Sequence, residues 1–347
     1  MNQLNSLRFI AILFIFLFHA RQCFGMPDNY IVGNMVAAAL TFFFFLSGFI
    51  LAYRYQNIHS LKEILNFYKN RLAHLWPLHI FLLLITIILF GNFKSIMFLE
   101  NLFLVQAWIP AGFESYFSYN AVTWCISALF FCYLLFPFIL MLGKKKCLIA
   151  NVIFIILLLI LIDVFKIVTV PFSRNAISVH YLVTVFPPTR SLVFILGICT
   201  YDIWNQYKYK KNKYSTWIEL FAVTVACLFI PFFRLPDLIS GAPATRLYLY
   251  SSHTIFILPL LLYIFASGYG IISKILKFRF LIFLGEMSFA VYMSHQLLIR
   301  FVVGHIELSN KVPVWRQFVA LVVIDLLISY ILWTFIENPF RKIIKKL

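Results

Sequence analysis

Ten long apolar stretches divide this sequence, and each has about the length that an α-helix needs to cross a lipid bilayer. A hydrocarbon core about 30 Å thick requires roughly 20 residues of helix. The stretches do not alternate in polarity with period two, which excludes the strands of a membrane barrel. The sequence therefore predicts an all-α, polytopic membrane helix bundle. The predicted spans are 7–22, 33–53, 72–91, 120–142, 147–169, 181–201, 216–233, 246–267, 281–302 and 316–336.

The composition agrees with a membrane protein. Hydrophobic residues make up 63% of the 347 residues and charged residues 12%, whereas soluble domains carry about 45–50% apolar and about 25% charged residues. The net charge of +17 lies mainly in loops between apolar spans, and no folded polar surface is predicted that would bind nucleic acid. No internal repeat or linker interrupts the chain. We therefore expect one membrane domain over residues 1–347, without a fused soluble domain.

Basic residues alternate between the loops and predict the orientation. Every second loop, together with the C-terminal tail, holds eighteen lysines and arginines, and the other loops hold nine. Because cytoplasmic loops are the richer in Lys and Arg, ten spans with both termini in the cytoplasm are predicted. The excess charge also favours contact with anionic membrane lipids. The sequence Arg21–Phe24 contains no small-residue cleavage site, so we expect the first span to be retained rather than removed as a signal peptide. A short interfacial helix is expected between Lys94 and Trp108.

The first span carries Arg8 and His19, two ionisable residues at membrane depth. Such residues are costly in lipid and mark functional sites. Eleven residues of helix separate them by about 16 Å along the axis, which places Arg8 at the cytoplasmic face and His19 beyond the midplane. As alternatives, Arg8 extends from a helix end toward water, and His19 makes an interhelical hydrogen bond.

Two further groups of residues lie near the second and third spans. Ser47 and Gly48 interrupt an apolar run, where a glycine lets two helices approach closely. Arg71 and His74 are spaced i,i+3 and face the same way at the cytoplasmic mouth of the third span. Two cationic donors at this level suit an anionic ligand such as a phosphate. The alternative is the ordinary basic decoration of a cytoplasmic loop.

Polar residues continue in the later spans. Trp124 and Ser127 open the fourth span, and Arg190 follows a double-proline break in the sixth. An arginine inside a span requires a partner or a hydrated cavity. A polar stripe in the ninth span and a single acid in the tenth complete the set. The stripe comprises Ser288, Tyr292 and His295, at i, i+4 and i+7; the acid is Asp325, which we hypothesise to pair with an arginine.

The six cysteines show no metal-ligand spacing, so we expect free thiols and no bound metal.

The order of these motifs resembles that of the acyltransferase-3 family, membrane O-acyltransferases that modify bacterial lipopolysaccharide, exopolysaccharide and related surface glycans. The resemblance runs from residue 7 to residue 340 and rests on joint order rather than on any single motif. The matching pieces are Leu7-Arg8 with His19, the run Phe43–Phe49, Arg71 with Trp76-Pro77, Trp124–Ser127 with Tyr133 and Pro137, Arg190 with Gly197, Gly285 with Ser288, Tyr292 and His295, and Glu337-Asn338-Pro339.

The resemblance implies a multi-pass enzyme of the bacterial cytoplasmic (inner) membrane. It would take acetyl from cytoplasmic acetyl-CoA and pass it to a hydroxyl of a glycan, either free or lipid-linked. Arg71 matches the first arginine of the family's R-x-x-R motif, which is thought to hold the nucleotide end of CoA, and His74 stands at the second. His19 matches the essential histidine, which acts as a general base or as a transient acyl carrier. Arg8 and Arg190 would stabilise phosphate or a developing oxyanion.

Three positions depart from the family pattern. His74 replaces the second arginine of R-x-x-R, and Leu129 and Val193 stand where the family often has glutamate. These departures are consistent with a subfamily that uses a different donor or acceptor, with succinyl or a longer acyl chain as alternatives to acetyl.

Two other classes of protein are alternatives to an acyltransferase. A transporter of polysaccharide or lipid-linked oligosaccharide would use the same intramembrane arginines and histidines, but the sequence contains no internal repeat or paired broken helices. A membrane sensor or scaffold would have no reason to keep His19, Arg71, Arg190 and His295 in this order.

Overall fold

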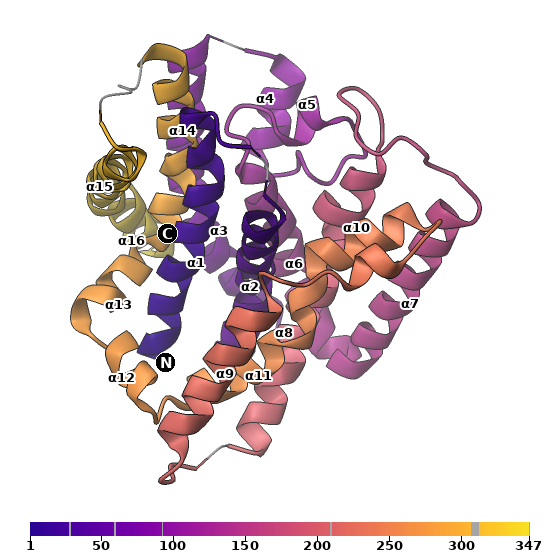
Figure 1. Cartoon of the computed structure of the whole chain (residues 1–347), viewed down its shortest axis with the longest axis vertical. Coiled ribbons are helices and arrows are strands. Elements are labelled where there is room, and N and C mark those ends of the chain that lie inside the picture. Colours follow the sequence, from indigo (N-terminus) through magenta and orange to yellow (C-terminus); the bar gives the residue numbers. More distant parts are fainter. Residues whose placement is uncertain (28, 59, 92, 209, 307–311, 347) are drawn as a thin grey trace.

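The computed structural model of the chain describes residues 1–346 except 28, 59, 92, 209 and 307–311, and over these residues it contains helices and loops but no strand (Figure 1). The α-helices are α1 (Asn2–Ala20), α2 (Tyr30–Arg54), α3 (Leu61–Phe90), α4 (Ser95–Leu102), α5 (Phe113–Tyr116), α6 (Thr123–Leu142), α7 (Lys144–Asp163), α8 (Pro187–Gln206), α9 (Ser215–Phe229), α10 (Pro243–Ser252), α11 (Leu258–Ser267), α12 (Ile271–Leu276), α13 (Arg279–Glu286), α14 (Ser288–His305), α15 (Val314–Leu332) and α16 (Asn338–Lys346). Short 3₁₀ segments are η1 (Arg21–Phe24), η3 (Leu235–Leu238) and η4 (His253–Phe256), and π-helical turns are η2 (Tyr181–Val185) and η5 (Trp333–Glu337).

Every predicted span coincides with a helix or with consecutive helices, which confirms the all-α membrane architecture. Within the described residues, 8 helical segments are long and apolar enough to cross a membrane, and the count rises to 9 if α13 and α14 form one span bent by 60°. The predicted span 216–233 is the 15-residue helix α9, which is shorter than that criterion. The predicted number of ten is therefore one more than length and composition support. A short helix, α4, occupies the first part of the Lys94–Trp108 stretch where an interfacial helix is predicted.

Helix α3 begins eleven residues earlier than the predicted span did. The Ser60 side chain accepts a hydrogen bond from the Glu63 amide at 3.2 Å and caps the first turn. The polar residues that follow favour helix, so α3 extends beyond its apolar part. As a result Arg71 and His74 lie about three turns inside α3, and the prediction that they sit at its mouth is corrected.

The bundle is centred on α2 and α8, which approach each other through glycines. A Cβ at Gly48 would lie 2.0 Å from the Phe194 carbonyl oxygen, and a Cβ at Gly197 would lie 2.0 Å from the Phe45 carbonyl oxygen. Neither position has room for a side chain, so the two backbones contact each other directly. The predicted close approach at Gly48 is thereby confirmed. The neighbouring Ser47 is held at a fixed position beside this contact.

Two buried carboxylates cap short helices at opposite ends of the bundle. Asp163 accepts hydrogen bonds from the amides of Ala244 and Thr245 at 2.8 and 2.9 Å, at the start of α10. Glu219 accepts from the amides of Gly270 and Ser273 at 2.8 and 2.9 Å, at the start of α12. A negative charge satisfies the unpaired amides of a helix N-terminus. The two acids therefore serve the fold.

The two ends of the bundle are called the near face, where α1 begins, and the far face, where α1 ends. The near face holds the N-terminus and α12, and the Ser6 hydroxyl donates to the Leu276 carbonyl there at 2.6 Å. The far face holds α4 and α5, which lie at the opposite end of the molecule from the N-terminus (Figure 1). Arg8 of α1 and Arg341 of α16 line one cavity, so the two terminal helices meet at the near face.

Candidate active site

Four arginines from four helices converge on a cavity of about 330 Å³ at the near face, called the arginine cavity. One carboxylate, Glu286, is among its lining residues, so the lining is strongly cationic. The four arginines are Arg8 of α1, Arg54 of α2, Arg71 of α3 and Arg341 of α16. Sequence reasoning found Arg8 and Arg71. It assigned Arg54 and Arg341 to loop decoration, because only the packing of α2 against α1 and of α16 against α3 brings them to one cavity.

Arg71 is the arginine best prepared to bind a ligand. Its Nε is buried and finds no acceptor within the described part of the chain. Its guanidinium carbon lies 5.8 Å from the ring centres of both Phe67 and Tyr133, whose aromatic faces support it. A buried polar atom without a partner is uncommon and calls for an explanation. A bound anion in the arginine cavity would provide one.

His74 lies one turn further along α3 and is paired with Glu337. Its Nδ1 is 3.6 Å from Glu337 Oε1, and the Glu337 side chain is 1% exposed. Neither carboxylate oxygen of Glu337 has a hydrogen-bond partner among the described residues. The π-helical turn η5 brings Glu337 to this position. The histidine that replaces the second arginine of R-x-x-R thus stands beside a buried acid.

A second, smaller cavity of about 90 Å³, called the Tyr292 cavity, adjoins the arginine cavity. The two share four lining residues: Arg8, Ser47, His74 and Tyr133. The Tyr292 cavity extends to Ser288 and Tyr292 on α14 and to Cys125 on α6. Five predicted site residues therefore line this space between α1, α2, α3, α6 and α14: Arg8, Ser47, His74, Ser288 and Tyr292.

His19 and His295 lie beside each other with tilted rings, and the His295 ring is next to that of Tyr292. The two imidazole centroids are 5.3 Å apart with planes at 43°, and the Tyr292 ring centre is 5.8 Å from that of His295. His295 is fully buried, and its Nδ1 lies 3.2 Å from the Val291 carbonyl oxygen. If that nitrogen donates, His295 Nε2 is left as a lone-pair acceptor. His19 Nδ1 and His295 Nε2 both lack a hydrogen-bond partner in the described structure.

Comparison with known proteins gives the family. The acyltransferase domain of the acyltransferase-3 family matches residues 1–334. The chain belongs to the acyltransferase-3 family. Acyltransferase MdmB of Streptomyces mycarofaciens is 24% identical over 380 residues, which cover 98% of this chain and 92% of MdmB. O-acetyltransferase OatA of Staphylococcus aureus is 23% identical over 363 residues, which cover 98% of this chain but 57% of OatA. No solved structure matches the chain.

Membership confirms the predicted resemblance and supports a membrane O-acyltransferase. The geometry shows which motif positions of this acyltransferase-3 chain meet. His19 and His295 are in contact, Arg8, Ser47, Arg71 and His74 share the arginine cavity, and Glu337 reaches His74. These residues come from α1, α2, α3, α14 and the end of η5. The predicted stripe of Ser288, Tyr292 and His295 runs along α14 from the Tyr292 cavity to His19.

Arg190 lies elsewhere in the acyltransferase-3 chain. It is buried, and it donates hydrogen bonds to the carbonyl of Thr184 in η2 and to the Ser251 carbonyl, the latter at 3.2 Å. Its guanidinium lies 5.8 Å from the Trp124 ring centre. Neither cavity described above includes Arg190 in its lining. The guanidinium N–H groups of Arg190 therefore link η2 to α10, and the Trp124 ring of α6 lies beside the guanidinium.

Ser127 anchors the loop that follows α4. Its hydroxyl donates to the Leu104 carbonyl at 2.7 Å and accepts from the Ala107 amide at 3.2 Å. Leu104 has a left-handed backbone conformation with φ of 59°, which is uncommon for leucine. The hydroxyl of Ser127 therefore stabilises a loop conformation that few residues adopt.

Asp325 pairs with serine rather than with the arginine that was hypothesised. The Ser294 hydroxyl donates to Asp325 Oδ1 at 2.7 Å and lies 2.9 Å from the Ser329 hydroxyl. All three side chains are buried between α14 and α15. Ser294 precedes His295, so this cluster holds α15 against the turn of α14 that carries the histidine.

Proposed function

We propose that this protein transfers an acetyl group from cytoplasmic acetyl-CoA to a hydroxyl of a bacterial surface glycan, such as a lipopolysaccharide O-antigen or an exopolysaccharide. One observation carries the proposal: the arginine cavity adjoins a smaller cavity lined by Tyr292, and the Tyr292 ring neighbours His295, which in turn neighbours His19. The reaction requires a binding site for a polyanionic acyl donor and a base that accepts the proton of the acceptor hydroxyl. The printed activity of OatA, an O-acetyltransferase, supports the acetyl group as the one transferred.

The arginine cavity suits the phosphate groups at the nucleotide end of acetyl-CoA. Guanidinium groups bind phosphate oxygens through paired, charge-assisted hydrogen bonds. Arg54, Arg71 and Arg341 stand at the cavity, while Arg8 and Ser47 line both cavities. We expect the thioester end to extend past Ser47 into the Tyr292 cavity, toward His19, while Arg8 contacts the phosphate groups of the donor.

His19 is the proposed general base. It takes the proton from the acceptor hydroxyl while the hydroxyl oxygen forms an ester bond with the thioester carbonyl carbon. The C–S bond breaks, and the proton taken up by His19 passes to the CoA thiolate, which leaves as the thiol. His295 contacts His19 and would hold its ring in position. Transient acylation of His19 followed by transfer to the hydroxyl is the alternative path, with the same overall balance.

This mechanism requires the near face to be cytoplasmic. The distribution of basic residues predicts that orientation, and the arginine cavity at the near face then opens toward the compartment that contains acetyl-CoA. His19 lies about 16 Å further along α1 than Arg8, so the acceptor glycan would approach from the far face. We accordingly place the protein in the bacterial inner membrane as a multi-pass enzyme.

The function is tested by expressing the protein in a bacterial host and measuring its surface glycan by mass spectrometry. We expect the glycan to gain 42 Da acetyl groups that mild alkali removes, as expected for esters (roughly the mass of one acetyl substituting a hydrogen). A glycan without any added acyl group would contradict the proposal. Movement of glycan across the membrane without acylation would identify the protein as a transporter.

Arg71→Ala is expected to raise the KM for acetyl-CoA about tenfold or more, with a smaller change in kcat. A charge-assisted hydrogen bond contributes about 1.5–3 kcal/mol, which corresponds to one or two powers of ten in affinity. The assay is transfer of radiolabelled acetyl in membranes at varied acetyl-CoA. Arg279→Ala is the control, since Arg279 is an exposed arginine that does not line the cavity. An unchanged KM in Arg71→Ala would remove this residue from the donor site.

A further inference from the structure

A third cavity, the Lys94–Arg300 pocket, opens at the far face and has no part in the donor site described above. Its volume is about 430 Å³, within the range of small-molecule sites. It lies between the end of α3, the α4–α5 region and α14. The residues on which the argument depends are Phe90, Lys94, Glu114, Phe117, Tyr119 and Arg300.

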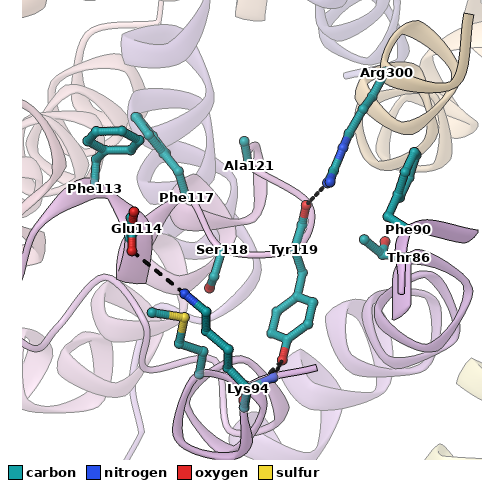
Figure 2. Close-up of a pocket in the computed structure, with 11 residues that line it drawn as sticks. Thr86, Phe90, Lys94, Phe113, Glu114, Phe117, Ser118, Tyr119, Ala121 and Arg300 are labelled. Atoms are coloured by element: carbon teal, nitrogen blue, oxygen red, sulfur yellow. Dashed lines mark hydrogen bonds and ion pairs between the residues drawn. The ribbon is translucent and has the colours of Figure 1, made fainter. Parts of the chain in front are cut away.

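Aromatic rings form opposite walls of this pocket. Figure 2 shows Phe113 and Phe117 on one side and Phe90 on the other, with the Tyr119 ring between them. The centroids of Phe113 and Phe117 are 6.4 Å apart. A pyranose ring presents apolar C–H faces and polar edges, so it packs its faces against such rings while its hydroxyls reach polar groups. The walls are therefore suited to a sugar.

The polar groups of the pocket are positioned and carry a net positive charge. Lys94 Nζ lies 3.6 Å from Glu114 Oε2, so these two charges neutralise each other. Arg300 donates one hydrogen bond to the Tyr119 carbonyl at 3.1 Å, and its guanidinium lies 3.9 Å above the Phe90 ring (Figure 2). Among the described residues, Glu114 is the one carboxylate in the lining, and Arg300 keeps N–H donors beyond its bond to Tyr119 for an external anion. A carboxylate on the ligand would satisfy them.

The floor of the pocket is attached to the turn of α14 that leads to the histidines. Tyr119 and Ala121 line the pocket, and their neighbours bind α14: Asn120 Nδ2 donates to the Met293 carbonyl at 2.8 Å, and the Tyr292 hydroxyl donates to the Val122 carbonyl at 2.8 Å. Arg300 follows His295 by about 7.5 Å along the helix and is rotated from it by about 140°. A ligand in the pocket is therefore near His295 but on a different side of α14.

We propose that the Lys94–Arg300 pocket binds an acidic sugar residue of the acceptor glycan, adjacent to the residue that is acylated. The sugar carboxylate contacts Arg300, and the pyranose ring packs against Phe90 and Phe117. Because Arg300 and His295 face different sides of α14, the bound sugar positions its neighbour rather than supplying the reacting hydroxyl. This inference rests on the proposed function for its biological meaning, but the binding itself can be measured separately.

The test measures direct binding of two oligosaccharide probes to purified protein in nanodiscs by saturation-transfer NMR. The acidic probe is a hexasaccharide of alternating glucuronic acid and N-acetylglucosamine, and the neutral probe is an N-acetylglucosamine hexasaccharide. We expect the wild type to bind the acidic probe about tenfold more tightly, as a charge-assisted hydrogen bond would give. Arg300→Gln should remove this preference. Arg316→Gln should keep it, because Arg316 is also an exposed far-face arginine over an aromatic ring, Trp315, but lies outside the pocket.

Two results would overturn the proposal: equal binding of both probes by the wild type, or an acidic preference that survives in Arg300→Gln. Phe117→Leu provides a second variant, which should weaken both probes while retaining the acidic preference. The thermal midpoint of each variant reports folding. Acetyl-CoA binding, measured in parallel, should be unchanged in Arg300→Gln. If the wild type did not bind acetyl-CoA, that result would contradict the proposed function alone. The two oligosaccharide measurements would still show whether the Lys94–Arg300 pocket binds an acidic sugar.

Discussion

Replacing His19 by alanine is expected to lower the rate of acetyl transfer at least about 100-fold. A positioned general base contributes roughly 10²–10⁴-fold to a reaction, and the proposed acyl-carrier role would be lost as completely. His19 lies next to His295, whose ring neighbours the Tyr292 ring of the Tyr292 cavity, and its Nδ1 has no hydrogen-bond partner among the described residues. The arginine cavity lies about 16 Å away along α1. The expected signature is therefore a lower kcat with an unchanged KM for acetyl-CoA.

The measurement is single-turnover transfer of radiolabelled acetyl to surface glycan in membranes that contain equal amounts of each variant. His305→Ala is the matched control, since His305 is an exposed histidine on α14 whose Nδ1 contacts the Phe301 carbonyl of its own helix. It should retain full activity. A stable, membrane-inserted His19→Ala protein that acetylates as fast as the wild type would refute the catalytic role.

The same assay separates the two proposed roles of His19. Rapid quenching of a reaction with acetyl-CoA but no acceptor should leave the protein unlabelled if His19 is a general base. Label on His19 that a glycan acceptor then removes would establish the acyl-histidine path instead. His295→Phe removes the ring nitrogens beside His19 while keeping an aromatic ring. We expect it to lower kcat less than His19→Ala does, because its proposed effect is to position His19.

Much of the fold could be predicted because hydropathy is a local property of the chain. All ten predicted spans coincide with helical segments, since each needs only an apolar run of about bilayer length. The helix ends were harder to place. The Ser60 cap starts α3 well before its apolar part, and the bend between Glu286 and Ser288 depends on packing against α1, where a Cβ at Gly285 would lie 2.1 Å from the Asn5 carbonyl oxygen.

The site could be predicted residue by residue but not as a cavity. Polar residues in apolar spans identified His19, Ser47, Tyr292 and His295, because lipid penalises them wherever they occur. Arg54 and Arg341 were missed, since an arginine at a helix end looks the same whether it faces water or a binding cavity. Which residues pair is a property of the tertiary packing.

Arg190 and Asp325 illustrate the same limit. The cost of burying a charge predicts that each has a partner, but not which one. Arg190 donates hydrogen bonds to backbone carbonyls of η2 and α10, and Asp325 accepts a hydrogen bond from a serine.

Gly48→Ala is expected to lower the thermal midpoint and the yield of folded protein, whereas Gly33→Ala in the same helix should not. The added methyl at Gly48 would lie 2.0 Å from the Phe194 carbonyl oxygen, a backbone atom that cannot rotate away. The helices α2 and α8 must therefore separate, and overpacking of this kind typically costs about 1–3 kcal/mol. At Gly33 nothing lies within 4 Å. Alanine there should be neutral or stabilising by roughly 0.5–1 kcal/mol, because it restricts the unfolded backbone.

The reciprocal contact at Gly197 makes this prediction a test of the close packing itself. Once Gly48→Ala has moved the helices apart, the further cost of Gly197→Ala should be smaller than its cost alone, so the two effects should not add. The thermal midpoint is measured on protein purified in detergent, heated and then analysed by size-exclusion chromatography. The forms compared are the wild type, Gly48→Ala, Gly197→Ala and the double variant. A Gly48→Ala protein as stable as Gly33→Ala would contradict the backbone contact. Since Ser47 lines both cavities, Gly48→Ala protein that does fold should also bind acetyl-CoA less tightly, because separating α2 from α8 shifts Ser47 within the donor site.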